Sequence, residues 1–169
     1  MAYLRYTTSA KIYGSDSVRG FPLILTASQQ VHFLSLHFFL DKSKAVAISS
    51  LKTYAQHLCD FLSQLEIDDC IECMSCVDDV YLHAYKESII NRSGHRNKES
   101  YAVAVISSVI NYLMWLENNG FFFNLIGETP EHKVRVTINH RKKIKHSLTK
   151  LTKSKQKKLL CRDQTGLIL

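Results

Sequence analysis

Residues 49 to 65 read "SSLKTYAQHLCDFLSQL", and this stretch decides the fold class. Its apolar side chains recur at steps of three and four residues, which places them on one face of an α-helix. Ser49 and Ser50 are candidates for the helix N-cap. Because such an apolar face has to be buried against other elements, the sequence predicts a helical domain. The face consists of Leu51, Tyr54, Ala55, Leu58, Leu62 and Leu65.

Three further segments have helical periodicity. The first is expected to start after the cap candidates Thr26, Ala27 and Ser28, and another has Asp78 and Asp79 in its first turn, where carboxylates complement the helix dipole. The last is expected to end at Asn118-Asn119-Gly120, since Asn and Gly favour a left-handed cap. The predicted ranges are about 29–40, 75–91 and 99–118. The expected fold class is therefore all-α, a compact four-helix bundle.

The segments on either side of the bundle have a different character. Residues 1–26 are expected to form an irregular or partly extended arm, and 27–130 the helical domain. The last segment, 131–169, is expected to be a basic linker, with one short strand at "KVRVTI" around Val134, Val136 and Ile138. A short helix is predicted within this linker, from Lys153 to Cys161.

The charge of the chain is unevenly distributed. Its formal net charge is +7 over 169 residues. Residues 1–131 carry 10 Lys and Arg against 14 Asp and Glu, whereas residues 132–169 carry 12 against one. Such an asymmetry favours a polyanionic partner, nucleic acid first and an acidic membrane second.

The sequence gives no sign of a membrane span or a secretory signal. The densest apolar run, "VHFLSLHFFL" at residues 31–40, has about half the roughly 20 residues that a span needs and contains two histidines. The N-terminus lacks an apolar region followed by a small-residue cleavage site. We therefore expect a cytoplasmic protein without membrane contact, in which the five cysteines stay reduced.

The order of the helices resembles the N-terminal core-binding domain of the tyrosine recombinases, the phage-integrase family. The resemblance covers about Leu23 to Thr129. It rests on a serine-led helix with "Y…L..F…L", a tyrosine-bearing helix, a basic loop and a helix with "I…NY..WL…G". In this chain these are Ser50-Leu51-Lys52-Thr53-Tyr54 with Leu58, Phe61 and Leu65; Tyr81 and Tyr85; Arg92 to Lys98; and Ile106, Ile110-Asn111-Tyr112, Trp115-Leu116 and Gly120.

The resemblance implies a fold and a partner. It implies a SAM-like helical bundle that clamps one side of a double-stranded DNA recombination site during integration or recombination, with other recombinase protomers on the same DNA as further partners. In the family a catalytic domain follows a basic linker. Here "LTKLTKSKQKKLL", from Leu148, resembles the opening helix of that domain, so 131–169 is expected to hold the linker and a truncated start.

The candidate DNA-binding residues lie in three places. The basic loop between the last two helices can place its charges on one backbone, and Arg96 and Asn97 have donors that can read purine edges. Polar groups at the start of the second helix can touch phosphate near its positive end, and the linker can follow the backbone. The candidates are Ser50, Lys52 and Thr53; Arg92, His95, Arg96, Asn97 and Lys98; and Arg141, Lys142, Lys143 and Lys145.

No catalytic residue and no cofactor is predicted. The family's active site needs an arginine, a lysine, a His-x-x-Arg pair and a tyrosine nucleophile in the second domain. His132 and Arg135 have the right spacing but precede that domain, and we treat the match as accidental. By itself the chain is expected to bind DNA without cutting or rejoining it.

The cysteines suggest a different function. Cys70, Cys73 and Cys76 have a C-x2-C-x2-C spacing, part of a ferredoxin run, but residue 80 is Val instead of the fourth cysteine. Zinc would need a fourth ligand, with Cys59 as the nearest cysteine and His57 or His83 as substitutes. The simpler interpretation is a connector between two helices that seals the edge of the core.

Two alternatives to DNA binding therefore remain. The first is a non-enzymatic helical module whose basic tail binds a protein or an acidic surface. The second is a regulator that binds metal through Cys59, Cys70, Cys73 and Cys76.

Overall fold

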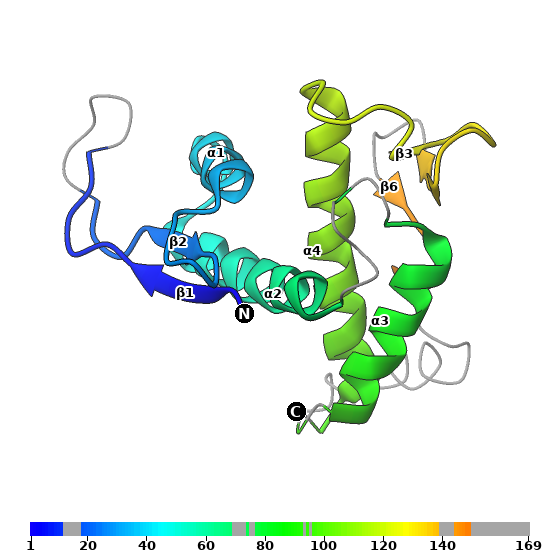
Figure 1. The fold of residues 1–169 in the computed structure, drawn as a ribbon, viewed down its shortest axis with the longest axis horizontal. Helices are drawn as coiled ribbons and strands as arrows, with labels where there is room; N and C mark the ends of the chain where they lie inside the picture. Colours follow the sequence, from blue (N-terminus) through cyan, green and yellow to red (C-terminus); the bar gives the residue numbers. More distant parts are fainter. Residues whose placement is uncertain are drawn as a thin grey trace, which may run out of the picture.

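The computed structural model describes residues 1–11, 18–68, 74, 77–92, 94, 96–138 and 144–149 (Figure 1). The described chain is mostly helical, with small two-stranded sheets. Its elements are β1 (Tyr3–Tyr6), β2 (Pro22–Leu25), α1 (Phe33–Lys42), α2 (Ile48–Ile67), α3 (Asp79–Arg92), α4 (Lys98–Asn118), β3 (Ile126–Gly127), β4 (Val134–Arg135), β5 (Thr137–Ile138), β6 (Ile144–Lys145) and a 3₁₀ helix, η2 (Ser147–Thr149).

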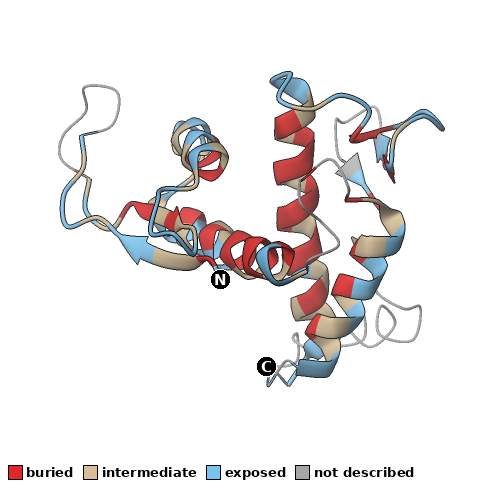
Figure 2. Cartoon of the chain, viewed as in Figure 1, coloured by how far each residue is buried: buried red, intermediate tan, exposed pale blue. Residues whose placement is uncertain are grey.

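Helix α4 is the central element of the fold. The hairpin β1–β2, α1 and α2 lie on one side of it, and α3 with the later strands lies on the other (Figure 1). Buried residues follow α4 along most of its length (Figure 2). By length and composition α4 could cross a membrane, but 56% of the relevant window is buried inside the fold, as in a core helix. The predicted apolar face is confirmed for Ala102, Val105, Ile106, Val109, Tyr112, Leu113 and Leu116.

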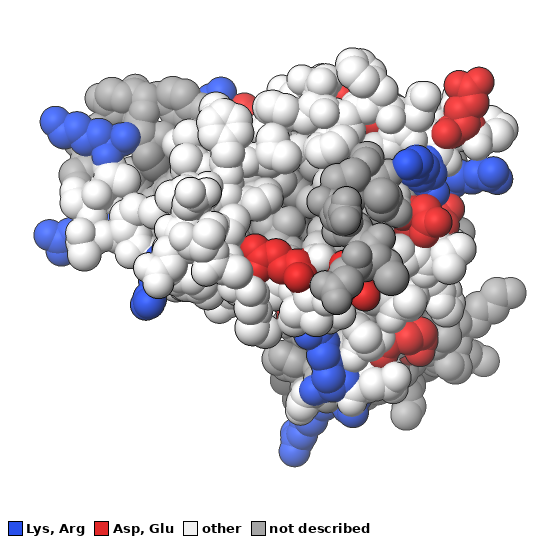
Figure 3. All heavy atoms as spheres, in the orientation of Figure 1, with Lys and Arg blue, Asp and Glu red and all other residues white. Residues whose placement is uncertain are grey.

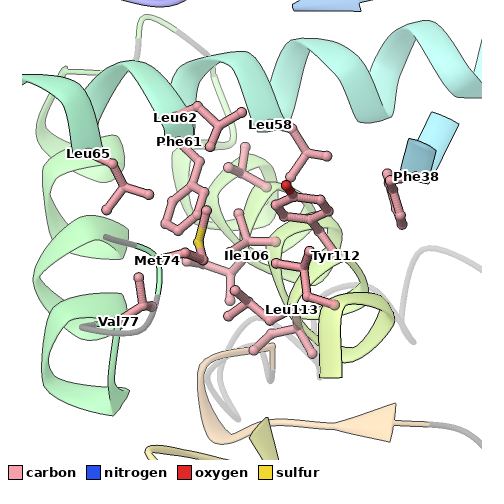
Figure 4. Close-up of a cluster of buried hydrophobic side chains, with 14 of the residues drawn as sticks. Phe38, Leu58, Phe61, Leu62, Leu65, Met74, Val77, Ile106, Tyr112 and Leu113 are labelled. Carbon is pink, nitrogen blue, oxygen red and sulfur yellow. The ribbon is translucent and has the colours of Figure 1, made fainter. Parts of the chain in front are cut away.

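The core forms where α2 crosses α4. Leu58, Phe61, Leu62 and Leu65 of α2 point toward Ile106 and Leu113 of α4, with Met74 and Val77 closing one end (Figure 4). Each fully buried aliphatic or aromatic side chain stabilises the fold by about 1.5–3 kcal/mol relative to exposure. Burial of these apolar faces, rather than helix propensity, therefore holds the helices in place.

Phe38 joins α1 to this core through aromatic contacts. Its ring centroid lies 5.2 Å from that of Tyr112, 5.7 Å from that of Trp115 and 6.4 Å from that of Tyr54. The interplanar angles of 72–78° are those of edge-to-face packing. Phe38 thus contacts α2 and α4 at once.

Three predicted helix starts are wrong in detail. α1 starts at Phe33, not after Ser28, because His32 caps it: the Ser35 amide donates to His32 Nδ1 at 3.2 Å. Ser49 and Ser50 lie inside α2, whose N-cap is Ala47. α3 starts at Asp79, and the Asp78 carboxylate caps it by accepting from the Tyr81 amide at 2.7 Å.

The arm that was expected to be irregular or partly extended contains a β-hairpin. β1 and β2 pair antiparallel, with Leu4 opposite Ile24 and Tyr6 opposite Pro22. The hairpin is tied to α2, since Ser63 Oγ donates to the Ala2 carbonyl at 2.8 Å. The sequence prediction missed it because each strand is only four residues long.

The C-terminus of α4 ends as predicted. Gly120 has φ +70°, a left-handed conformation that suits glycine. The Gly120 amide donates to the Glu117 carbonyl and the Phe121 amide to the Leu116 carbonyl, both at 3.0 Å. These two bonds form a Schellman motif.

The predicted strand at "KVRVTI" is two short strands with different partners. β4 pairs parallel with β3, whereas β5 pairs antiparallel with β6. Val134 and Val136 are buried, as the alternation predicted. The predicted helix at Lys153–Cys161 lies outside the described residues.

Glu117 anchors the segment that follows α4. Its carboxylate accepts the amides of Asn124 at 3.1 Å, Leu125 at 2.8 Å and Ile126 at 3.4 Å. We expect Glu117→Gln to lower the free energy of unfolding by about 1–3 kcal/mol, because an amide NH₂ would face backbone donors. Urea unfolding measures this. Glu87→Gln, on the exposed side of α3, is the control and should change stability by less than about 0.5 kcal/mol. Equal stability of both variants would contradict a role for Glu117.

Candidate nucleic-acid interface

The junction between α3 and α4 carries the predicted basic loop. Arg92 is the last residue of α3 and Lys98 the first of α4, with Arg96 and Asn97 in the turn between them. All four side chains are exposed. Lys and Arg gather at this end of the molecule, at the bottom of Figure 3. The structure therefore brings together these four of the five predicted loop residues; His95 lies outside the described residues.

Arg92 is already engaged within the protein. Its guanidinium forms an ion pair with Asp60 of α2, and Tyr85 Oη donates to the same carboxylate at 2.7 Å. The Arg92 guanidinium also lies 5.8 Å from the centre of the Tyr85 ring. Burial raises the pKa of Tyr85, so its hydroxyl keeps the proton that it donates. Arg92 thus ties α3 to α2, and its charge is partly neutralised.

Arg96 and Lys98 form no ion pair with a carboxylate among the described residues. Asn97 occupies the N-cap of α4, but its side chain makes no capping hydrogen bond. These three residues lie at the positive end of the α4 dipole, a place that favours an anion, and the first turn of α4 also holds Glu99.

The candidates on α2 do not form one group. Ser50 and Thr53 face α4 and line an open groove of about 360 Å³. Lys52 lies on the opposite side of α2, with Nζ 5.3 Å from the centre of the Tyr6 ring in the hairpin. Helical geometry thus places Lys52 on a different side of α2 from Ser50 and Thr53, and phosphate contact by the three residues stays a prediction.

The groove between α2 and α4 is lined by neutral polar and apolar side chains, without a described Lys or Arg. Ser107 Oγ donates to the Val103 carbonyl at 2.8 Å, and Asn111 Nδ2 donates to the Ser107 carbonyl at 2.8 Å. The lone pairs of these side chains and the second N–H of Asn111 remain for a ligand. Without a cation the groove gives a DNA backbone no charge compensation, so it suits a neutral polar ligand better. The full lining is Ser50, Thr53, Tyr54, His57, Ala104, Ser107, Ser108 and Asn111.

His57 is a buried residue that lines the groove. Its Nδ1 lies 2.7 Å from Ser108 Oγ, and Ser108 donates to the Ala104 carbonyl at 3.1 Å. Nδ1 therefore carries the proton of the His57–Ser108 bond. Burial lowers the pKa of His57, and the nearby Asp60 opposes this only partly. The neutral ring links α2 to α4.

This burial predicts a pH dependence. Because the pKa of His57 is lower in the folded chain than in the unfolded chain, the unfolded state binds more protons as the pH falls below about 6.5. Stability should fall on acidification, by at most about 1.4 kcal/mol per pH unit for each such histidine. His32, whose pKa is lowered mainly by burial, acts in the same direction. Urea unfolding between about pH 7 and pH 5 measures the slope.

The variant His57→Asn isolates the contribution of His57. Asparagine can donate to Ser108 from nearly the same position as Nδ1 but does not titrate. The slope should become shallower, while Gln56→Asn, at the exposed neighbouring position, should keep the wild-type slope. An unchanged slope in His57→Asn would overturn the assignment.

The linker candidates are described only in part. Arg141, Lys142 and Lys143 lie outside the described residues. Lys145 is exposed on β6. The next residue, His146, contacts the start of α3, since its Nε2 lies 2.8 Å from Asp79 Oδ1. α3 has 14 residues and is thus about 20 Å long. Lys145 therefore lies at the opposite end of α3 from the basic loop, and the structure does not bring the two together.

The metal hypothesis is not tested. Cys70, Cys73 and Cys76 lie outside the described residues. Cys59 is buried on α2, and burial raises the pKa of its thiol. In the part of the chain that the structure describes, no three His, Cys, Asp or Glu side chains group as metal ligands would.

Comparison with known proteins adds no relative: no family model, curated protein or solved structure matches the chain.

The sequence did not point to Asp60, the carboxylate that engages Arg92. The two residues are 32 positions apart and on different helices. Asp60 lies within α2 and is not part of the apolar face. Its contact with Arg92 depends on how α2 packs on α3, which the sequence does not show. The hairpin cations Arg5, Lys11 and Arg19 were missed as well, although Lys and Arg outnumber Asp and Glu in residues 1–26.

Proposed function

We propose that this chain is the DNA-binding, N-terminal portion of a site-specific tyrosine recombinase. In this proposal α1–α4 form the SAM-like core-binding bundle, and double-stranded DNA in the cytoplasm is the partner, with further recombinase protomers bound alongside. The sequence resemblance over Leu23 to Thr129 motivates the family. The helical content and the order of the four helices are consistent with it.

One observation carries the proposal. Arg96, Asn97 and Lys98 are exposed around the N-terminus of the 21-residue α4, and no described carboxylate neutralises the two cations. A phosphate there would gain hydrogen bonds from three side chains and favourable interaction with the helix dipole. The 12 Lys and Arg of residues 132–169 would add sequence-independent affinity.

In the same proposal the chain has no catalytic activity. The arginine, lysine, His-x-x-Arg and tyrosine of the family's second domain have no counterpart that we assign here. His132 hydrogen-bonds Thr129 Oγ1 through Nδ1 at 2.7 Å, and Arg135 is exposed on β4. Binding should therefore leave a supercoiled plasmid unrelaxed, and relaxation would contradict this part of the proposal.

A salt titration of binding to arbitrary duplex DNA tests the proposal. Each phosphate contact should contribute a slope of about −0.9 in log K against log salt concentration. We expect measurable affinity at low salt that declines steeply as salt rises. Absence of affinity at low salt would rule the proposal out.

Exposed apolar side chains favour a second candidate, a helical module that binds another protein. Phe123 is 83% exposed, Val80 76% and Phe121 41%. Such side chains are common at protein interfaces. Apolar contacts persist or strengthen as salt rises, whereas phosphate contacts weaken, so the same titration separates the two functions.

A further inference from the structure

The N-terminal hairpin has two different faces. Leu4, Tyr6, Pro22 and Ile24 share the face toward α2, and Ile24 is 1% exposed. By strand alternation Tyr3 and Arg5 share the outer face. The pairing continues beyond the strands through the Ala10–Val18 bridge, so the hairpin extends away from the helices (Figure 1).

The hairpin region carries four cations without a carboxylate partner among the described residues. Arg5, Lys11 and Arg19 are exposed, and Lys52 of α2 reaches the hairpin at Tyr6. The nearby Glu66 carboxylate is taken by the Met1 amino group, at 2.8 Å. Figure 3 shows Lys and Arg of the described residues at this end of the molecule.

Two other cations of the described chain are neutralised by carboxylates. Lys44 forms an ion pair with Asp41 at 3.1 Å, and Arg92 forms one with Asp60. At the hairpin, aromatic rings take the place of carboxylates. The Arg5 guanidinium lies 5.4 Å from the centre of the Tyr3 ring, and Lys52 Nζ lies 5.3 Å from that of Tyr6. A ring orients the cation without cancelling its charge.

Given the proposed function, we propose that the hairpin is a second DNA-contacting surface, in which Arg5, Arg19 and Lys52 bind the phosphate backbone of a duplex. A two-stranded ribbon is narrow enough to lie along the major groove of B-DNA, and cations that lie over aromatic rings and keep their charge suit a nucleic acid. Tyr6, which is 43% exposed, would contact the sugar or phosphate beside Lys52.

The hairpin surface is separate from the α3–α4 junction. Lys52 and Asp60, the partner of Arg92, are both on α2 and eight residues apart, which corresponds to about 12 Å along the helix axis. Duplex DNA carries one charge per roughly 1.7 Å of its axis. The two surfaces would therefore hold different phosphates of one duplex, and their contributions to the salt slope would add.

The test compares duplex binding by the full chain with that of Arg5→Gln/Arg19→Gln. Over a salt titration with an arbitrary duplex of about 30 base pairs, loss of two phosphate contacts should reduce the slope by about 1.8 and the affinity at 0.1 M salt by roughly 60-fold. Lys133→Gln/Arg135→Gln removes the same charge near the start of α3. This control should retain more of the salt slope and more of the affinity than the hairpin variant. Arg5→Lys/Arg19→Lys, which keeps the charge, should restore most of the slope.

The outcomes distinguish this inference from the proposed function. If the wild-type chain binds duplex DNA and the hairpin variant behaves like the Lys133→Gln/Arg135→Gln control, the hairpin inference is overturned and the proposed function stands. If the wild-type chain binds no duplex at all, both fail. Hairpin-dependent binding to vesicles that contain anionic lipid, without duplex binding, would also overturn the inference, because the polyanion would then be a membrane.

Discussion

Replacing Phe38 with alanine is expected to lower the free energy of unfolding by about 3–5 kcal/mol, a large part of the stability of a domain of this size. Phe38 is fully buried, and its ring packs edge-to-face against Tyr112 and Trp115 of α4 and Tyr54 of α2. Truncation would leave a cavity at the point where three helices meet. Urea unfolding followed by far-UV circular dichroism measures the effect.

Phe33→Ala is the matched control on the same helix. Phe33 is 60% exposed and contacts only the His37 ring among described aromatic residues, at 4.2 Å. Its loss should cost less than about 1 kcal/mol. If Phe38→Ala does not fold, Phe38→Leu keeps most of the volume and should lose a smaller, measurable part of the stability. Equal effects at positions 33 and 38 would contradict the packing described for α1.

Neutralising the α3–α4 junction should weaken duplex binding strongly. In Arg96→Gln/Lys98→Gln two exposed cations beside the α4 N-terminus are removed without breaking an ion pair of the described residues. At 0.1 M salt each phosphate contact contributes about 0.9 log units, so duplex affinity should fall roughly 60-fold. Fluorescence anisotropy with a labelled duplex, measured over a range of salt, gives both the affinity and the slope.

A matched control removes the same charge elsewhere. Lys133 and Arg135 are exposed near the start of α3, about 20 Å from its last residue, Arg92. Lys133→Gln/Arg135→Gln changes the net charge equally and should weaken binding much less. If the two double variants lose affinity equally, net charge alone governs binding and the junction has no special role.

The helical part of the fold could be predicted from the sequence because burial imposes a period. Leu51, Leu58 and Leu62 on α2 and Val105 and Val109 on α4 recur at helical spacing and are buried as expected. Helix starts were less predictable. Ser49 and Ser50 looked like caps of α2, yet the helix begins at Ile48 and its N-cap is Ala47, two residues before Ser49.

The candidate site could be predicted only locally. Arg96, Asn97 and Lys98 are adjacent in sequence, and a turn between two helices keeps them together. Whether a cation is free depends on contacts between distant elements, as the Arg92–Asp60 pair illustrates. The contact of Lys52 with Tyr6 was not predictable for a similar reason, because the hairpin was not recognised in the sequence.

The central position of α4 has a consequence for synthesis of the chain on the ribosome. The inner faces of α1, α2 and α3 pack on residues such as Tyr112, Leu113 and Leu116, which are translated after all three helices. Until α4 emerges from the exit tunnel, these apolar faces have no cover, and nascent chains in that state are prone to aggregate. A pause in translation after residue 97 would extend this exposed period, whereas the same pause after α4 has emerged from the tunnel would fall on a chain whose core can already close.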